Sequence, residues 1–177
     1  MRCLFYLYGG EMFEHSIGPF FDEKSNILIL GSFPSVKSRE ENFYYANKQN
    51  RFWKVLAQVF KDQVPESESE KKDFLTAHGI ALWDVIASCE ILGSSDASIK
   101  NVTPSDISLI LENAPIEKLV LNGKKAAQLF YRNQGSAHPL RNCKAQVIEV
   151  YELPSTSPAN AAFSLDALIA HWSIISK

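Results

Sequence analysis

The sequence predicts an α/β protein, a three-layer α/β/α sandwich in which helices cover both faces of a mostly parallel four-stranded sheet. Short continuous apolar runs alternate along the chain with segments in which apolar residues recur every three or four positions. The first pattern is typical of strands buried on both faces, and the second is typical of amphipathic helices. Regular alternation of the two patterns favours a parallel sheet.

The first half of the chain contains two expected strands and two expected helices. Residues 27–30, ILIL, form an apolar run that the small residues of 31–35, GSFPS, end abruptly. Residues 50–60 place apolar side chains at helical spacing, and a polar turn then leads into a helix over 70–77. Residues 80–87, IALWDVIA, are expected to form one buried strand that carries a single charge.

The second half repeats the alternation. Thr103-Pro104-Ser105-Asp106 offers a cap and an early proline, which are typical of a helix start. The remaining expected elements are a loop at 90–102, a helix from 103 to about 113, a strand at 118–121, a helix at 124–131, a strand at 146–151 and a helix at 164–175.

Length and composition indicate one compact domain. A chain of 177 residues with 46% apolar and 21% charged residues is neither disordered nor fibrous. We expect a single domain over residues 15–177, preceded by an extension at 1–14 that is either loosely held or an added first strand. No apolar run approaches the ~18 residues of a membrane span.

The three cysteines lie far apart and form no C-x-x-C motif. Four histidines, His15, His78, His138 and His171, are equally scattered, so each is expected in a core or surface role. These spacings argue against a zinc or iron–sulfur site and against a disulfide scaffold. We therefore expect a cytoplasmic protein with reduced thiols and no bound metal.

The net charge of −2 gives no overall sign of a nucleic-acid partner. Between residues 36 and 54, however, five basic residues stand against two acidic ones. This local excess suits an anionic ligand. Solvated surface charges would give the same pattern.

Two loops of Gly, Ser and Pro follow expected strands: GSFPS at 31–35 and LPSTSPAN at 153–160. Ligands of open α/β sheets bind at the carboxyl ends of the strands. Small residues let the backbone approach a ligand, and hydroxyl and amide groups donate to phosphate oxygens. Two such loops at one edge could hold a sugar–phosphate backbone, although each could also be an ordinary strand-to-helix turn. Neither G-x-G-x-x-G nor the P-loop motif occurs.

Taken together, these motifs resemble the uracil-DNA glycosylase superfamily, in which GSFPS and LPSTSPAN correspond to the first and second motifs. The segment from Tyr45 to Lys54 is similar to the one that follows the first motif in mismatch-specific uracil glycosylases. The ordered series FPSVKS, FYYANKQNRFWKVL, GIALWDVIASCE, LNGKKAAQLF and LPSTSPAN looks most like the hypoxanthine-DNA glycosylase (DNA-deoxyinosine glycosylase) branch. The resemblance covers roughly residues 15–175.

The resemblance implies a monofunctional DNA glycosylase that flips a deaminated base, hypoxanthine above all, and hydrolyses its N-glycosidic bond. It implies DNA as the partner, duplex or single-stranded, with no cofactor and a monomeric protein. Asn50 matches the asparagine on which the hypoxanthine branch relies. A neutral amide can orient water or donate to the departing base. Asn50 could instead cap the helix that follows it.

Two positions depart from the superfamily pattern. Phe33 stands where mismatch-specific members carry an asparagine that positions the attacking water, and Leu153 stands where many members carry a histidine that steadies the departing base. Both departures fit the hypoxanthine branch. Three other functions stay open: a uracil or mismatch-specific glycosylase, a non-catalytic DNA-binding or damage-sensing module, and a hydrolase of free nucleosides.

Three residues are expected to contact the base: Phe33, Tyr45 and Asp84. The ring of Tyr45 can stack on an extruded base, although it could equally pack in the core beside Phe43 and Tyr44. An ionised Asp84 can only accept hydrogen bonds and hypoxanthine offers N1–H as a donor. A capped or ion-paired aspartate at a strand end is the alternative.

The remaining candidates are expected to contact the DNA backbone. Residues 158–160 could enter the gap that a flipped base leaves, or Ser157-Pro158 could cap and start the last helix. The expected DNA-binding residues are Ser32, Ser35, Lys37, Ser155, Thr156, Ser157 and Asn160.

Overall fold

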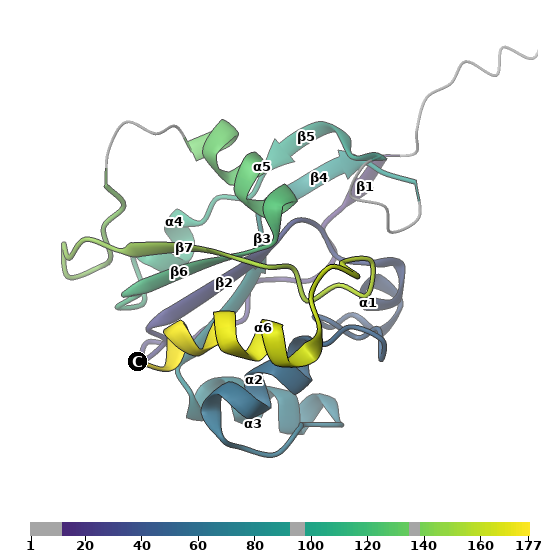
Figure 1. Cartoon of the computed structure of the whole chain (residues 1–177). Helices are drawn as coiled ribbons and strands as arrows, with labels where there is room; N and C mark the ends of the chain where they lie inside the picture. The colour runs from purple at the N-terminus through teal and green to yellow at the C-terminus, as the bar shows by residue number, and fades with distance from the viewer. Residues whose placement is uncertain (1–11, 93–97, 135–138) are drawn as a thin grey trace, which may run out of the picture.

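The computed structural model describes residues 12–92, 98–134 and 139–177, and it has the predicted three-layer α/β/α architecture (Figure 1). His138 and residues 1–11 of the expected extension lie outside the described residues. The central sheet has four parallel strands in the order β3 (Ile80–Asp84), β2 (Ile27–Gly31), β6 (Lys118–Asn122) and β7 (Glu149–Leu153).

The strands of this sheet end level with one another. Gly31 pairs with Asp84 in the β2–β3 register, and Asn122 pairs with Leu153 in the β6–β7 register. All four carboxyl ends therefore lie along one edge of the sheet. The loops that follow β2 and β7 both leave from that edge.

Both faces of the sheet are buried, which explains the continuous apolar runs. Along β2, Leu28 and Leu30 belong to one core cluster, whereas Ile27 and Ile29 belong to the other. The first cluster includes side chains of α4 (Ser108–Leu111) and α5 (Lys124–Gln134). The second includes side chains of α2 (Phe52–Phe60), α3 (Glu68–Ala77) and α6 (Leu165–Trp172). Figure 1 shows these two groups of helices on opposite sides of the sheet.

A second, antiparallel sheet was not predicted. It contains β1 (Met12–Glu14), β4 (Ile86–Glu90) and β5 (Lys100–Pro104), in the order β1-β4-β5. The single strand expected at 80–87 is therefore wrong. The amide of Val85 still donates to the carbonyl of Gly31 at 2.9 Å, but the chain then turns out of the parallel sheet and starts β4.

The same sheet changes the expected loop and helix that follow. The end of the loop predicted at 90–102 forms β5, while residues 93–97 lie outside the described part of the chain. Thr103 and Pro104 end β5 rather than starting a helix, because the chain there pairs with β4. The helix is accordingly the short α4.

Two further differences, and the start of the last helix, affect the surroundings of the loops. An unpredicted helix, α1 (Val36–Glu41), starts directly after GSFPS. Strand β7 lies later than the predicted 146–151 and ends at Leu153. The last helix begins after Ser164, whose hydroxyl accepts from the amide of Ala167 at 3.2 Å. The helix predicted at 164–175 thus begins where expected, and the alternative in which Ser157-Pro158 starts it is wrong. A 3-10 turn, η2 (Ser173–Ser176), follows α6.

Within the described ranges, no helix has the length and apolar character needed to cross a membrane.

Candidate active site

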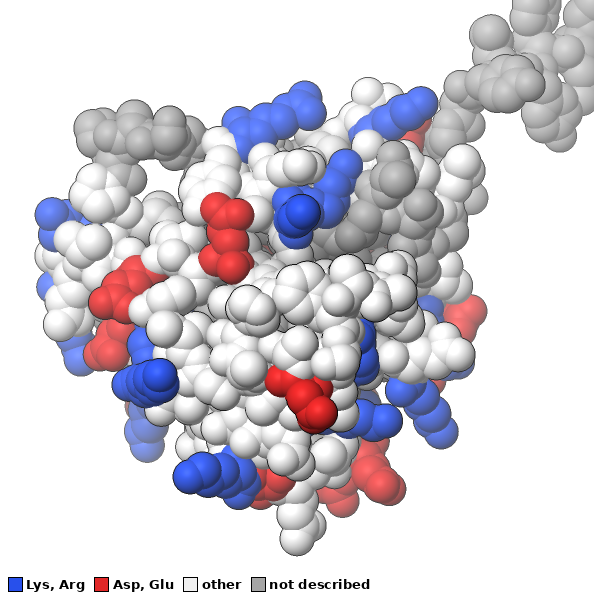
Figure 2. All heavy atoms as spheres, in the orientation of Figure 1, with Lys and Arg blue, Asp and Glu red and all other residues white. Residues whose placement is uncertain are grey.

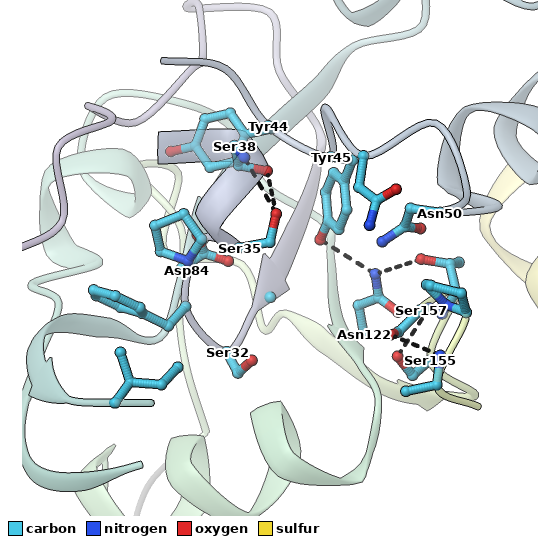
Figure 3. A pocket seen from close by; sticks show the side chains of 18 residues that line it. Ser32, Ser35, Ser38, Tyr44, Tyr45, Asn50, Asp84, Asn122, Ser155 and Ser157 are labelled. Atoms are coloured by element: carbon cyan, nitrogen blue, oxygen red, sulfur yellow. Dashed lines mark hydrogen bonds between the residues drawn. The ribbon is translucent and has the colours of Figure 1, made fainter. Parts of the chain in front are cut away.

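A pocket opens at the carboxyl edge of the parallel sheet, between the first loop (residues 31–35) and the second loop (residues 153–160). Its volume is about 240 Å³, slightly below the range of about 300–1,000 Å³ that drug-sized ligands occupy. This size suits a single flipped base. Nine of the residues predicted for the site line it: Ser32, Phe33, Ser35, Tyr45, Asn50, Asp84, Ser155, Thr156 and Ser157. In Figure 3, Asp84 lies on one side of the pocket and Asn50 and Asn122 on the other.

The first loop takes its shape from close packing. Phe33 is buried, and its ring meets the ring of His15 edge to face at a centroid distance of 5.8 Å. A Cβ atom added to Gly31 would lie 2.2 Å from Oδ1 of Asp84. The loop ends where the hydroxyl of Ser35 accepts from the amide of Ser38 at 3.2 Å and caps α1.

Asp84 is the last residue of β3 and is only 4% exposed. Its Oδ2 lies 2.8 Å from Nε2 of His15. The two interpretations of this aspartate are therefore compatible, because the same carboxyl group is paired at a strand end and lines the pocket.

Tyr45 forms part of the pocket wall in a backbone conformation that side chains rarely adopt, with φ of 50°. Its ring stacks on that of Phe52 at a centroid distance of 3.7 Å. The neighbouring Tyr44 is buried and donates its hydroxyl to the carbonyl of Gly18 at 2.9 Å. Burial, together with the charge of Asp84, raises the pKa of the Tyr44 hydroxyl. Tyr44 thus packs in the core and also borders the pocket, whereas the less buried Tyr45 lies between core and pocket.

Asn50 lines the pocket and is half-buried. Its Oδ1 accepts from the amide of Phe52 at 3.0 Å. Because a backbone N–H can only donate, this bond identifies the amide oxygen. The amide nitrogen Nδ2 then has no hydrogen-bond partner among the described residues and is available as a donor. Asn50 can therefore support the start of α2 and act in the pocket at once.

Asn122 is a site residue that was not predicted from the sequence. It is the last residue of β6, and its Nδ2 donates to the Tyr45 hydroxyl at 3.2 Å and to Oγ1 of Thr156 at 3.1 Å. Its Oδ1 accepts from the amide of Thr156 at 3.1 Å. One buried amide therefore joins the second loop to Tyr45, as the dashed lines in Figure 3 show. Its sequence signals were its place at a strand end before Gly123 and its position in the motif LNGKKAAQLF.

Arg51 holds the second loop from outside. Its Nη2 donates to the carbonyls of Ser157 at 2.7 Å and Asn160 at 2.9 Å, and its Nε donates to that of Thr156 at 3.3 Å. Its Nη1 donates to the carbonyl of Phe163. A single guanidinium group thus binds three carbonyls of the second loop and one carbonyl shortly after it.

Two predicted DNA contacts serve the loop itself. Thr156 is fully buried, so its hydroxyl lies inside the contact with Asn122. Asn160 does not line the pocket, and its Nδ2 donates to the carbonyl of Ser155 at 2.9 Å.

Lys37 also lies outside the pocket lining. Its ammonium group is 3.3 Å from carboxyl oxygens of both Glu40 and Glu41, and these partners raise the pKa of Lys37. On the face shown in Figure 2, basic and acidic side chains are interspersed. In the described part of the chain, no three His, Cys, Asp or Glu side chains come together as metal ligands.

The sequence and the fold both match known proteins. The model of the family described as "Uracil DNA glycosylase superfamily" matches residues 19–173. The chain belongs to the uracil DNA glycosylase superfamily. This confirms the family that the ordered motifs indicated, and with it the predicted class of enzyme, a DNA glycosylase.

Two curated relatives are named hypoxanthine DNA glycosylase. The one from Methanosarcina acetivorans is 34% identical over 155 residues, covering 86% of this chain and 92% of the relative. The one from Methanosarcina barkeri is 33% identical over 119 residues, covering 66% of this chain and 75% of the relative. The solution structure of a candidate uracil DNA glycosylase from M. acetivorans has a TM-score of 0.74 at 28% identity, covering 93% of this chain and 96% of that one.

Proposed function

We propose that the protein excises hypoxanthine from deoxyinosine in DNA, by flipping the nucleotide into the pocket and hydrolysing its N-glycosidic bond. The observation that carries this proposal is the pairing of an acceptor and a donor across one base-sized pocket. The Asp84 carboxyl group lies on one side, and the Asn50 amide nitrogen is available on the other. The names of the two curated relatives point to the same base.

Asp84 is proposed to read the edge of the base. An ionised carboxylate is an acceptor only, and hypoxanthine presents N1–H as a donor. Tyr45, whose ring already lies against Phe52, supplies an aromatic surface at the pocket wall for the flipped base. Phe33 is proposed to close the apolar side of the pocket next to Asp84.

Asn50 is proposed to act on the reacting bond. As the N-glycosidic bond breaks, positive charge develops on the sugar and negative charge on the departing base. An uncharged donor held next to that base stabilises the negative charge without needing a strong base. Neither loop contains a lysine that could attack C1′, so water is the proposed nucleophile.

The exposed parts of the two loops are proposed to hold the DNA backbone around the lesion. Ser32, Ser35, Ser155 and Ser157 line the pocket and are partly exposed. Hydroxyl and backbone N–H groups of this kind donate to phosphate oxygens. The exposed Pro158 and Ala159 lie at the pocket, where they can fill the space that the flipped base leaves.

An abasic-site assay tests the substrate. Duplexes carrying deoxyinosine, deoxyuridine or deoxyxanthosine at the same position are incubated with the protein and treated with alkali, which breaks the strand at abasic sites. We expect the fastest breakage with deoxyinosine. Binding without breakage would instead support a damage sensor, and activity on free inosine alone would support a nucleoside hydrolase.

Replacing Asn50 tests the proposed catalytic role. Asn50→Ala should lower the single-turnover rate on deoxyinosine by about 10²–10³-fold, the usual cost of removing one donor to a developing negative charge. It should also lower the melting temperature slightly, because the amide of Phe52 loses its acceptor.

Ser67→Ala provides the matched control. Ser67 caps α3, away from the pocket, through an acceptor bond from the amide of Glu70 at 3.2 Å. Losing such a cap costs ~1 kcal/mol and should leave the excision rate unchanged. If Asn50→Ala behaves like Ser67→Ala, Asn50 only supports a helix and the catalytic assignment is wrong.

A further inference from the structure

His15 lies outside both loops and none of the motifs includes it, yet it contacts the residue proposed to read the base. It follows β1, and its side chain is 4% exposed. Its Nε2 lies 2.8 Å from Oδ2 of Asp84, and its ring packs edge to face against Phe33 at 5.8 Å. Because this imidazole is buried, it does not serve the solubility of the surface, and its contacts with Asp84 and Phe33 point to a role in the pocket.

The hydrogen bonds of His15 define its tautomer. The amide of Ile17 donates to Nδ1 at 3.2 Å. A nitrogen that accepts an N–H bond carries a lone pair, so the ring proton belongs on Nε2. Nε2–H therefore donates to Oδ2 of Asp84, and this oxygen is used as an acceptor.

Gly31 completes the cradle of the carboxyl group. The other oxygen, Oδ1, lies over Gly31, where an added Cβ would approach it to 2.2 Å. His15 thus fixes one oxygen, and the first loop fixes the direction of the other. The carboxyl group has little freedom to rotate.

We propose that His15 is a positioning residue that holds Asp84 as a hydrogen-bond acceptor and thereby restricts the pocket to bases with a ring N–H at that edge. This inference rests on the proposed function. Deamination of adenine turns N1 from an acceptor into an N–H donor. An acceptor held against this edge can pair with N1–H of hypoxanthine. With adenine, the lone pair of N1 would instead face a lone pair of the carboxylate. The undamaged base is rejected because a buried polar group would then stay unpaired.

Without the Nε2–H donor, this discrimination weakens. A carboxyl group that is no longer held can rotate away from the base. Loss of His15 should therefore change which bases are cut, in addition to how fast they are cut.

Two substitutions separate this role from packing. In His15→Asn the amide stands where the ring carries Nδ1, so the side chain can still accept from Ile17 but falls short of Asp84. In His15→Gln the amide is one bond longer and can reach Asp84 with an N–H donor. Both replacement side chains are polar, and neither is much larger than histidine. Melting temperatures verify that both variants fold.

The experiment compares two substrates that differ only at the base edge. One duplex carries deoxyinosine and the other carries N1-methyldeoxyinosine at the same position, and the wild-type protein should prefer the first by at least about tenfold, the value of one hydrogen bond to a charged group. His15→Asn should lose rate on deoxyinosine by about tenfold and change little on the methylated base. His15→Gln should recover much of the preference.

A binding measurement covers the case in which the methylated base is not cut. Fluorine at C2′ disfavours positive charge on the sugar, so 2′-fluoro forms of the two nucleotides bind without reacting. The ratio of their dissociation constants should fall with His15→Asn and return with His15→Gln.

Equal losses on both substrates would show that His15 only packs the pocket, and would overturn the proposal. So would an unchanged preference in His15→Asn. A wild-type protein that does not excise hypoxanthine at all would overturn the proposed function instead, so the two failures are distinguishable.

Discussion

The two loops that form the pocket are held in different ways. The first loop leaves β2, which lies between β3 and β6, and it is fixed by packing through the buried Phe33 and the close approach of Asp84 to Gly31. The second loop leaves β7, which has only β6 as a neighbour in its sheet. Side chains from other elements hold it instead, through bonds to its backbone.

These supports of the second loop are polar and come from distant parts of the chain. Arg51 binds its carbonyls, Asn122 binds both the amide and the hydroxyl of Thr156, and the indole nitrogen of Trp172 donates to the carbonyl of Pro154 at 3.0 Å. A loop at the edge of a sheet lacks a strand on one side, so its backbone groups need other partners. Added volume should therefore damage the first loop, and lost hydrogen bonds should damage the second.

Among changes that separate the two loops, the largest effect is expected from adding one methyl group to the first loop. Gly31→Ala would place Cβ 2.2 Å from Oδ1 of Asp84, well inside contact distance. The carboxyl group must move, and a displacement of about 1 Å in a positioned group can cost ~10²-fold in rate. We expect a loss of this size in single-turnover excision of hypoxanthine.

Gly18→Ala is the matched control for this change, because a Cβ at Gly18 would meet nothing within 4 Å. It should leave the excision rate as it is. Near-normal excision by Gly31→Ala would mean that the first loop adapts to added volume, and the contrast between the loops would then fail.

A smaller loss of activity, with a clear loss of stability, is expected from the second loop. Arg51→Ala removes the guanidinium bonds to the carbonyls of Thr156, Ser157, Asn160 and Phe163. The first two keep a backbone N–H donor, whereas the last two lose their side-chain donor. Hydrogen bonds to a charged group contribute about 1.5–3 kcal/mol each, and these are partly exposed, so we expect a total of about 3 kcal/mol. Urea unfolding measures the change in the free energy of unfolding. The excision rate should fall as the second loop becomes less ordered.

Two further variants sharpen this result. Arg51→Lys keeps the charge but lacks the planar fork that reaches several carbonyls, so it should recover only part of the stability. Lys54→Ala removes an exposed charge from the same helix and should change little. If Arg51→Lys is as stable as the wild type, charge alone holds the second loop and the hydrogen bonds do not.

The sequence predicted the parallel sheet well because β2, β3 and β6 are short and mainly buried apolar runs, whereas the largely exposed β7 was predicted too early in the chain. It failed for the second sheet. The run IALWDVIA continues without interruption across Val85, where the chain leaves one sheet for the other. Strand β5 is largely exposed and polar. It is a strand only because β4 pairs with it, and such pairing leaves no trace in local periodicity.

The parts of the candidate site that have a local sequence pattern were predicted, and the parts that depend on contacts between distant residues were not. Small residues after buried strands indicate a loop that can approach a ligand, and this located both loops. Asp84 lies 69 residues from His15 along the chain, Thr156 lies 34 from Asn122, and the carbonyls bound by Arg51 lie 105 or more from it. Each of the three looks like an ordinary loop or strand-end residue in sequence, so their contributions emerge only when distant segments meet.

The smallest expected effect tests how well water is excluded from the surroundings of the first loop. Tyr44 borders the pocket on that side, and burial, followed by the charge of Asp84, raises the pKa of its hydroxyl above the ordinary value near 10. In the unfolded chain the same hydroxyl ionises above about pH 10, whereas in the folded protein it stays protonated. The unfolded state therefore gains stability as the pH rises past 10, and the folded protein loses up to ~1.4 kcal/mol per pH unit from this group.

Tyr44→Phe removes this dependence. At pH 7 the variant should be less stable by about 1 kcal/mol, because the bond to the carbonyl of Gly18 is lost. The difference should shrink and then reverse between pH 10 and 11 in urea unfolding. Tyr131 and Tyr151, whose pKa values are also raised, contribute equally to both proteins and cancel. A stability difference that stays constant with pH would mean that water reaches Tyr44, and packing alone could not then explain how the first loop is held.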